Sequence, residues 1–277
     1  MEVHSLNNKD FGFKVNEISY ENPYNYSVVH RHTYFEIFLF DIGIGGEQII
    51  DFNKYEIKDK TLFIVVPGQV HLLNRKESEG GLIIQFTQEF LNTQITTASI
   101  DALFALKTNP VSHLSNADYE TLKKSFFYLL SLENSKEAYK AEKLKHYFAF
   151  TMFQILGTIE RTTTVTKKNS ITLNYLLLAE RRFINDRKIS NYALQLNIAV
   201  SKLNYVIKKD LGKTPSEIIQ ELLSIEIKRL ILLEEMSHKE ISFHLNFDSA
   251  SSYNRFVKTH MGCNPTEVLK SLKTHNY

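Results

Sequence analysis

The sequence predicts an α+β fold class, with an N-terminal β domain and its trailing helices followed by an all-α domain. Three observations support this prediction. Short runs rich in Val, Ile, Phe and Tyr, separated by Gly and Pro, occupy the first 90 residues. Apolar residues then recur three or four positions apart from about residue 117. A pattern of 11 residues also occurs twice in the last third of the chain, which indicates a duplicated unit.

Length and composition fit two ordinary domains. The chain has 277 residues, of which 43% are hydrophobic and 12% aromatic. Its formal net charge is only +2, but residues 174–277 contain 15 Lys and Arg against 11 Asp and Glu, whereas residues 1–173 contain 18 against 20. The basic excess therefore lies in the C-terminal part, in the direction expected for a nucleic-acid partner.

Cysteine usage and the lack of targeting signals point to the cytoplasm. Cys263 is the only cysteine, which excludes a disulfide within the chain and fits a reducing compartment. The N-terminus has no signal-peptide pattern, and no apolar run approaches the roughly 20 residues needed to span a membrane. We therefore expect a cytoplasmic protein without a membrane partner.

The N-terminal strands are expected to be short and evenly spaced, which predicts a sandwich or a small barrel. Glycines and the pair Pro67-Gly68 separate them. The predicted strands cover residues 28–29, 35–40, 48–52, 61–66 and 82–86.

Two helices of about four turns or more are predicted over residues 117–160. They either cover one face of the β domain or also form the seam of a homodimer, because the apolar stripe is long and narrow. The stripe consists of Ala141, Leu144, Phe148, Met152, Ile155 and Ile159.

Residues 161–173 are polar and β-branched and form the best linker candidate, between domains at 1–160 and 174–277.

The repeated pattern spans residues 208–218 and 258–268, an offset of 50 residues. Lys, Gly, Pro and Glu are identical in the two copies, and Leu/Met, Thr/Asn, Ser/Thr and Ile/Val match in kind. Each copy follows a short helical pair with a tight turn, which is the layout of a DNA-reading module. The C-terminal domain is therefore predicted to hold two helix-turn-helix modules in tandem.

In the first module, a short helix is expected over residues 189–196. Asn197 follows where the turn needs a left-handed residue, for which Asn is the best replacement of Gly. Ser201 begins or caps the second helix. One long helix over residues 215–233 then leads to the second module, and Pro215 is acceptable in its first turn.

The second module carries clearer helix-start signals. Ser237 caps its first helix, with Glu240 three residues on, which makes a capping box. Asn246 lies in the turn, and either Asp248 or Ser249 caps the following helix.

The outward side chains of each module's second helix have the chemistry of base reading. Asn and Arg can each form two hydrogen bonds to a base edge, and Ser and Lys can bond a base or a phosphate. A rigid connector would place the two helices in successive major grooves, about 34 Å apart. The candidate DNA-binding residues are Ser201, Lys202, Asn204, Tyr205, Lys208, Lys209, Ser249, Ser251, Ser252, Asn254, Arg255 and Lys258.

A wider pattern extends through residues 240–249, 252–258 and 262–265, with Ile-Ser, Asn-Phe, Tyr-Asn-Arg-Phe-Val-Lys and Gly-Cys-Asn-Pro at fixed spacing. It resembles the AraC/XylS family of bacterial transcription regulators, whose pattern reads Ile-Ala, Gly-Phe, Phe-x-Arg-x-Phe-Lys and Gly-x-x-Pro. The resemblance covers residues 174–272. It implies a DNA-binding regulator of promoter DNA, with RNA polymerase as a further candidate partner.

The N-terminal domain carries a constellation of metal-ligand residues. His30, His32 and Glu36 are followed after about 35 residues by His71. Three imidazoles and a carboxylate make a complete ligand set for a divalent transition metal. If the first three lie on one strand, the period of two places them on one face, pointing into a barrel.

This spacing resembles the cupin fold, a β-barrel whose two motifs match His30, His32 and Glu36 and then His71. The second motif departs from the pattern, since Pro67-Gly68 lacks the intervening residue and Thr61 stands where Gly is usual. The resemblance implies a barrel that senses an unidentified small molecule or mediates dimer contacts. It leaves open a histidine remnant without metal, a metal sensor and a catalytic metal centre, and we expect no cofactor.

The function predicted is a ligand-responsive transcription regulator rather than an enzyme. The sequence has no Gly-rich phosphate loop, no Gly-x-Ser-x-Gly elbow and no Cys-x-x-Cys, and Cys263 is expected to be incidental. One alternative is a metal-dependent cupin enzyme or metal sensor fused to a DNA-binding module. Another is a regulator that has no small ligand and is controlled by a protein bound to the barrel.

Overall fold

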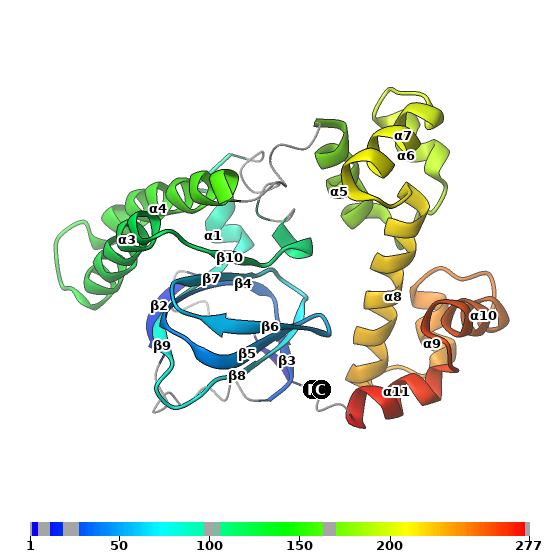
Figure 1. The fold of residues 1–277 in the computed structure, drawn as a ribbon, viewed down its shortest axis with the longest axis horizontal. Coiled ribbons are helices and arrows are strands. Elements are labelled where there is room, and N and C mark those ends of the chain that lie inside the picture. Colours follow the sequence, from blue (N-terminus) through cyan, green and yellow to red (C-terminus); the bar gives the residue numbers. More distant parts are fainter. Residues whose placement is uncertain are drawn as a thin grey trace. The chain divides into compact units, whose positions relative to one another are not determined.

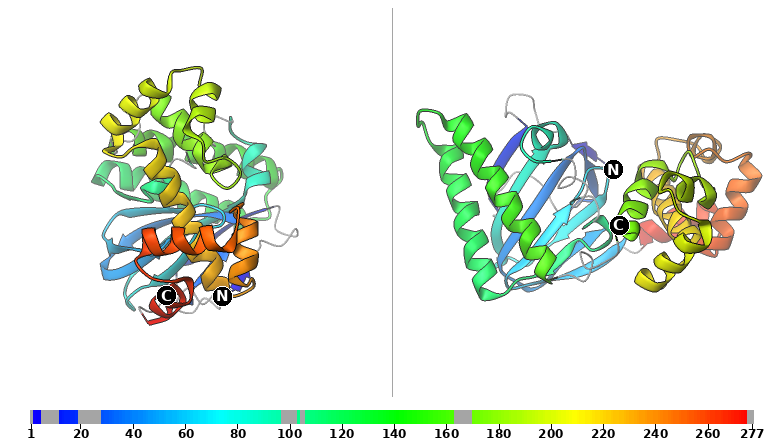
Figure 2. Two further views of the ribbon diagram at one scale, coloured as in Figure 1. Left: turned by 90° about the vertical axis from the view of Figure 1, so that its right-hand side faces the viewer. Right: turned by 90° about the horizontal axis from the view of Figure 1, so that it is seen from above.

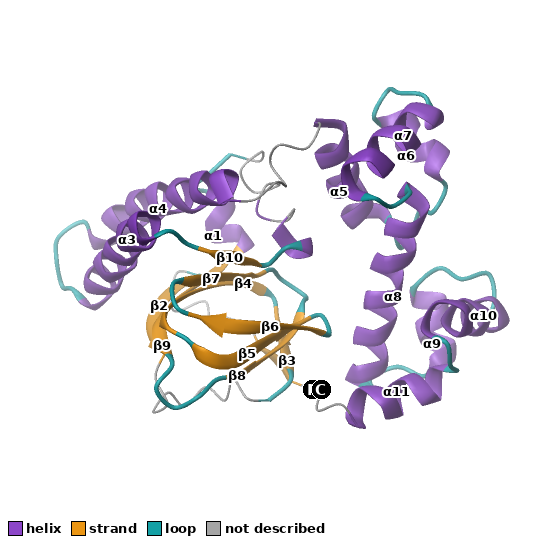
Figure 3. Ribbon diagram, viewed as in Figure 1, coloured by secondary structure: helices purple, strands orange, loops and turns teal. Residues whose placement is uncertain are grey.

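The computed structural model describes residues 2–4, 12–18, 28–96, 103, 106–162 and 170–274. The chain divides into two compact units, Met1–Lys167 and Lys168–Tyr277 (Figure 1). Among the described elements, the first unit combines all the strands with four helices, and the second contains helices throughout its described part (Figure 3). The mixed fold class expected from the sequence is confirmed.

The strands of the N-terminal unit form two five-stranded sheets. Within the described residues, pairing ends at the edges of each sheet, so the strands form two facing sheets and not the closed barrel that was predicted. The first sheet has the order β1 (Glu2–His4), β3 (His30–His32), β8 (Val70–Asn74), β5 (Ile44–Ile50) and β6 (Asn53–Lys58). The second has the order β10 (Val111–His113), β7 (Thr61–Val65), β4 (Tyr34–Ile42), β9 (Gly80–Thr87) and β2 (Phe13–Ile18).

Strand β4 is buried on both faces from Tyr34 to Phe40. Because side chains alternate along a strand, Phe38 and Phe40 face the interior between the sheets. Phe35 and Ile37 point the other way, into a second core beneath the helices. The predicted strand at 28–29 is irregular, since the chain becomes extended only at His30.

The second sheet is covered by helices. After α1 (Gln88–Asn92) and the short η2 (Leu106–Thr108), α3 (Asn116–Asn134) and α4 (Lys140–Thr162) run side by side over it (Figure 2). Ser115 starts α3 by accepting a hydrogen bond from the Asp118 backbone N–H.

The apolar stripe of α4 lies in this second core and does not form a free seam. Phe148 is fully buried, with its ring centroid 5.3 Å from Phe13, 4.9 Å from Phe86 and 5.1 Å from Phe90. Of the two roles predicted for these helices, the stripe therefore serves to cover the sheet. Met152, Ile155 and Ile159 are buried in the same core.

The predicted linker at 161–173 is shorter than expected. Helix α4 continues to Thr162 and α5 begins at Ser170, so both ends of the predicted linker are helical. Residues 163–169 lie outside the described residues.

The C-terminal unit is built around a long central helix. The helices are α5 (Ser170–Arg182), α6 (Ile189–Gln195), α7 (Val200–Leu211), α8 (Pro215–Leu233), α9 (His238–His244), α10 (Ala250–Met261) and α11 (Pro265–Thr274). The pair α6–α7 lies toward one end of α8 and the pair α9–α10 toward the other (Figure 1). None of the helices in the described ranges is long and apolar enough to cross a membrane.

Candidate nucleic-acid interface and candidate metal centre

Each helix pair of the C-terminal unit has the geometry of a helix-turn-helix module. Asn197 and Asn246 adopt left-handed φ angles of 53° and 52° in the two turns, as predicted. Gly212 and Gly262 end α7 and α10 in the same left-handed conformation. The two modules therefore repeat each other in backbone as well as in sequence.

The starts of the two second helices differ. In α10, Ser249 is the cap and Ser252 completes a capping box, so both hydroxyls are engaged in hydrogen bonds within the helix start. In α7, the cap is Ala199 and makes no side-chain hydrogen bond. Ser201 is therefore not a cap, because the helix starts at Val200, and its hydroxyl lies on the exposed face.

The candidate residues of α7 form an exposed face opposite a buried one. Leu203, Val206 and Ile207 are buried, whereas five candidates are exposed. Asn204 is half-buried and donates a hydrogen bond from Nδ2 to the Val200 carbonyl oxygen at 3.1 Å. Sequence reasoning missed Val200 itself, which is 41% exposed at the tip of the helix. The exposed candidates are Ser201, Lys202, Tyr205, Lys208 and Lys209.

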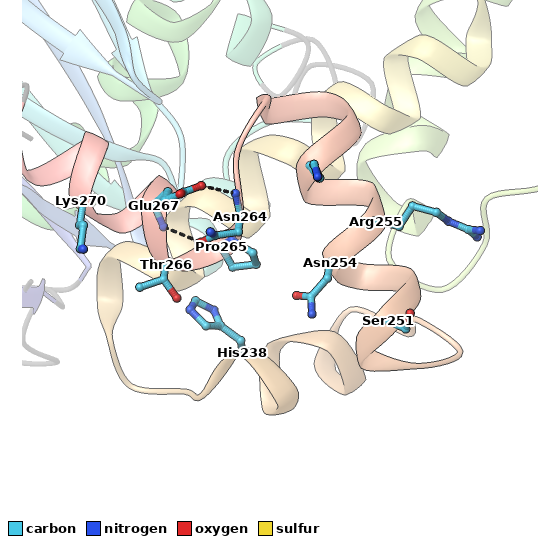
Figure 4. Close-up of a pocket in the computed structure, with 10 residues that line it drawn as sticks. His238, Ser251, Asn254, Arg255, Asn264, Pro265, Thr266, Glu267 and Lys270 are labelled. Carbon is cyan, nitrogen blue, oxygen red and sulfur yellow. Dashed lines mark hydrogen bonds between the residues drawn. The ribbon is translucent and has the colours of Figure 1, made fainter.

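The candidate residues of α10 border a groove of about 770 Å³ (Figure 4). Its lining comes from the start of α9, one face of α10 and the first turns of α11. Sequence reasoning missed His238 and Lys270, which line the groove but lie outside the repeated pattern at 258–268. Ser251, Asn254, Arg255 and Lys258 contribute from α10.

Residues 192–271 match the family model described as a helix-turn-helix domain. The chain is 24% identical over 275 residues to the "Uncharacterized HTH-type transcriptional regulator YfiF" of Bacillus subtilis, a match that covers 95% of this chain and 85% of that protein. The chain therefore contains a helix-turn-helix domain and is similar over most of its length to a transcriptional regulator.

Among solved structures, ToxT of Vibrio cholerae is 16% identical, with a TM-score of 0.43, over 94% of this regulator and 98% of ToxT. A cupin protein of Bacteroides fragilis is 22% identical, with a TM-score of 0.22, over 27% of this regulator and 64% of that protein.

The N-terminal unit brings together the four predicted metal-ligand residues. One ligand atom from each of His30, His32, Glu36 and His71 lies within 4.8 Å of the others, and all four side chains are buried. The spacing suggested that His30, His32 and Glu36 share one strand, but they lie on two strands of different sheets. The chain passes from the first sheet to the second at Thr33, so Glu36 faces the histidines across the interior.

Backbone contacts orient two of the imidazoles. His30 Nδ1 lies 2.7 Å from the Val28 carbonyl oxygen, and His32 Nδ1 lies 2.6 Å from that of Tyr34. A carbonyl oxygen only accepts, so Nδ1 carries the proton in each ring. In the neutral imidazole, Nε2 then presents its lone pair toward the cluster, which is the form that ligates a metal.

Glu36 is held as a carboxylate between the sheets. Burial by itself raises the pKa of Glu36, but when His32 is protonated its charge and its hydrogen bond, together with the hydrogen bond from Gln85 and the charge of His30, bring that pKa below the ordinary value. Gln85 Nε2 donates to Oε1 at 2.7 Å, while Oε2 lies 3.1 Å from His32 Nε2 and 3.4 Å from His71 Nε2.

Two glutamines support this cluster from outside it. Gln85 orients Glu36, and Gln48 Nε2 lies 3.3 Å from His71 Nδ1, on the ring edge away from the cluster. Nothing in the spacing of the sequence indicated either residue. Three imidazole nitrogens and one carboxylate oxygen fit the preferences of a divalent transition metal. Fixed outer partners of this kind are typical of metal sites.

Proposed function

We propose that this protein binds promoter DNA through α7 and α10 and that its N-terminal unit adjusts that binding in response to a small molecule. The observation that carries the proposal is the duplicated helix pair, because each second helix is apolar on its inner face and polar or basic on its outer face. An effector that binds one conformation more tightly shifts the population toward it, and DNA affinity changes accordingly.

Within this proposal, some outward side chains contact base edges and others contact phosphates. Arg255 and Asn254 read base edges, since both are exposed on α10 and offer paired hydrogen bonds. Tyr205 and Ser201 play that part on α7. Lys208 and Lys258, at equivalent positions of the repeat, hold phosphates. Ser249 and Ser252 contribute through the helix start that they cap.

A pocket of the N-terminal unit supports the effector part of the proposal. It encloses about 330 Å³ beside α3 and combines an apolar wall, including Leu39 and Phe127, with polar groups. Lys123 Nζ lies 2.8 Å from Asp41 Oδ2, and this contact lowers the pKa of Asp41. Such a lining suits a small amphipathic molecule with a polar end that competes for Lys123 or Asp41.

Two further partners belong to the same proposal. A homodimer would double the number of DNA modules and allow an effector to change their spacing. Contact with RNA polymerase would convert DNA binding into a change of transcription. The resemblance of residues 174–272 to the AraC/XylS family supports both, and the expected location for these partners is the cytoplasm.

A metal sensor is the second candidate function, and the buried histidine cluster favours it. His30, His32, His71 and Glu36 would hold the ion. A bound divalent metal supplies Lewis-acid polarisation. The residues themselves join two sheets, so occupancy would tie strands β3 and β8 to β4.

Binding of the full chain to a labelled promoter fragment from its own genomic neighbourhood tests the proposed function. We expect saturable binding that weakens steeply with salt, because phosphate contacts release counterions. A small molecule that raises the thermal unfolding temperature of the chain should also change this affinity. A chain that binds no duplex DNA at low salt would refute the proposal.

A further inference from the structure

The groove beside α10 can be compared, residue by residue, with the same place in the first module. The repeat aligns α10 with α7 at an offset of 50 residues, and α9 with α6 at an offset of 49. Several lining residues have an identical or similar counterpart. These pairs are Ser251 and Ser201, Asn254 and Asn204, Lys258 and Lys208, Asn264 and Thr214, Pro265 and Pro215, Thr266 and Ser216, and Glu267 and Glu217.

The three remaining differences all change the groove in one direction. His238, Arg255 and Lys270 stand where the first module has Ile189, Tyr205 and Gln220. Each difference adds a hydrogen-bond donor or a positive charge to the second groove. Burial lowers the pKa of His238, so its imidazole is a neutral donor at pH 7.

The acidic residue of the groove does not cancel these charges. Glu267 accepts a hydrogen bond from the Asn264 backbone N–H at 2.9 Å, and Asn264 caps α11 in return. Glu217 does the same for Thr214 in the first module, so this carboxylate is common to both. The distinguishing charge of the second groove is therefore positive.

The additional lysines of the first module lie elsewhere. Lys202 and Lys209 correspond to Ser252 and Thr259, and neither of these lines the groove. The first module thus carries its extra charges on a different flank of its second helix. A cationic groove between the second helix and the helix that follows the module belongs to the second module.

We propose that the groove between α9, α10 and α11 is a binding site for one phosphodiester strand of DNA, formed by Lys270 and His238 together with Lys258. The inference rests on the proposed DNA-binding function and adds a place for the strand beside the reading helix. Lysine and arginine neutralise phosphate charge, and the neutral imidazole donates to a phosphate oxygen. Figure 4 shows His238, Asn254 and Thr266 around one hollow, with Lys270 on the α11 side and Arg255 on the α10 side.

The test measures the salt dependence of binding by the full chain to a mixed-sequence duplex of about 30 bp, roughly three helical turns. Lys270→Gln installs the residue of the first module and should reduce the slope of log Kobs against log salt by about one. Lys273→Gln is the matched control, because Lys273 lies on the same helix but pairs with Glu234 at 2.6 Å and does not line the groove.

The possible outcomes distinguish a failure of the strand-site proposal from a failure of the proposed DNA-binding function. A slope that falls for Lys270→Gln but not for Lys273→Gln supports the strand site. A Lys270→Gln slope equal to that of the unchanged chain would overturn it while leaving DNA binding in place. An equal fall for Lys273→Gln would also overturn it, since the effect would then come from overall charge. No binding by the unchanged chain would instead remove the proposed function itself.

Discussion

His32 Nε2 lies 3.1 Å from Glu36 Oε2, although the two residues belong to different sheets. Only Thr33 separates their strands β3 and β4 along the chain. The contact therefore joins the two sheets across the interior of the N-terminal unit. Both side chains are fully buried, so the pair is stabilised only if its remaining polar atoms find partners.

The first prediction concerns metal binding at this cluster. Titration of the purified chain with Zn²⁺ or Ni²⁺ should show one ion bound per chain and a rise in thermal unfolding temperature, because a ligand that binds only the folded state stabilises it. His32→Ala should abolish both effects. His113→Ala serves as the control, since His113 lies outside the cluster.

DNA affinity measured with and without the ion distinguishes the two candidate functions. We expect unchanged affinity if the cluster is structural, and a changed affinity that His32→Ala removes if the protein senses metal. Stoichiometric metal retained by His32→Ala would show that the ion binds elsewhere.

A second prediction addresses the outer partner of Glu36. Gln85→Met keeps the size of the side chain but removes the donor that holds Glu36 Oε1 at 2.7 Å. Metal affinity should fall by about 10- to 100-fold, as for other outer partners of metal ligands. Isothermal titration with Zn²⁺ measures the change, and an unaltered affinity would mean that Gln85 does not position Glu36.

The third prediction separates base reading from phosphate holding on α10. Arg255→Ala should relax base preference at one position of the binding site by about 1–3 kcal/mol. Lys258→Ala should instead weaken binding to all sequences alike. Affinities for a panel of single-base variants of the bound promoter measure both effects. A base profile that survives Arg255→Ala would contradict the reading role.

The fourth prediction concerns the aromatic core beneath α4. Phe148→Ala removes a fully buried ring that contacts Phe13, Phe86 and Phe90, and should cost about 3–5 kcal/mol in the free energy of unfolding. Phe153→Ala, on the same helix but 50% exposed, should cost much less. Urea unfolding compares the two.

Sedimentation of the same variants tests whether the stripe is also a seam. We expect the assembly state of Phe148→Ala to change only as far as its folding does. A variant that loses a dimer while keeping its stability would restore the seam interpretation.

The fifth prediction concerns the turn of the first module. Asn197 has φ of 53°, a region that costs a residue with a Cβ roughly 1–2 kcal/mol unless its side chain helps. Asn197→Gly should preserve stability, whereas Asn197→Ala should lower it by about 1 kcal/mol. Thermal unfolding of the full chain gives the comparison, and equal stabilities of the two variants would rule out backbone strain at this turn.

The C-terminal unit was the more predictable part because its signals are local. The left-handed Asn246, the capping box of Ser237 with Glu240 and the helix from Pro215 to Leu233 all depend on neighbours within a few residues. Of the two roles expected for Ser201, the capping role is wrong, because the helix begins at Val200, two residues earlier than a cap at Ser201 requires. The exposure of Val200 and the position of Lys270 beside the groove depend on tertiary packing, so no local sequence pattern indicates either of them.

The sequence by itself determined the α+β class, the tandem modules and the set of residues able to bind a metal. It could do so because hydrophobic period, turn residues and ligand chemistry are properties of short segments. Only the tertiary structure decided that Glu36 meets the histidines from the opposite sheet and that the α4 stripe is covered by β2, β9 and α1. Gln48, Gln85 and the groove at Lys270 were likewise decided by long-range contacts, since residues distant in the chain meet there once the core has formed.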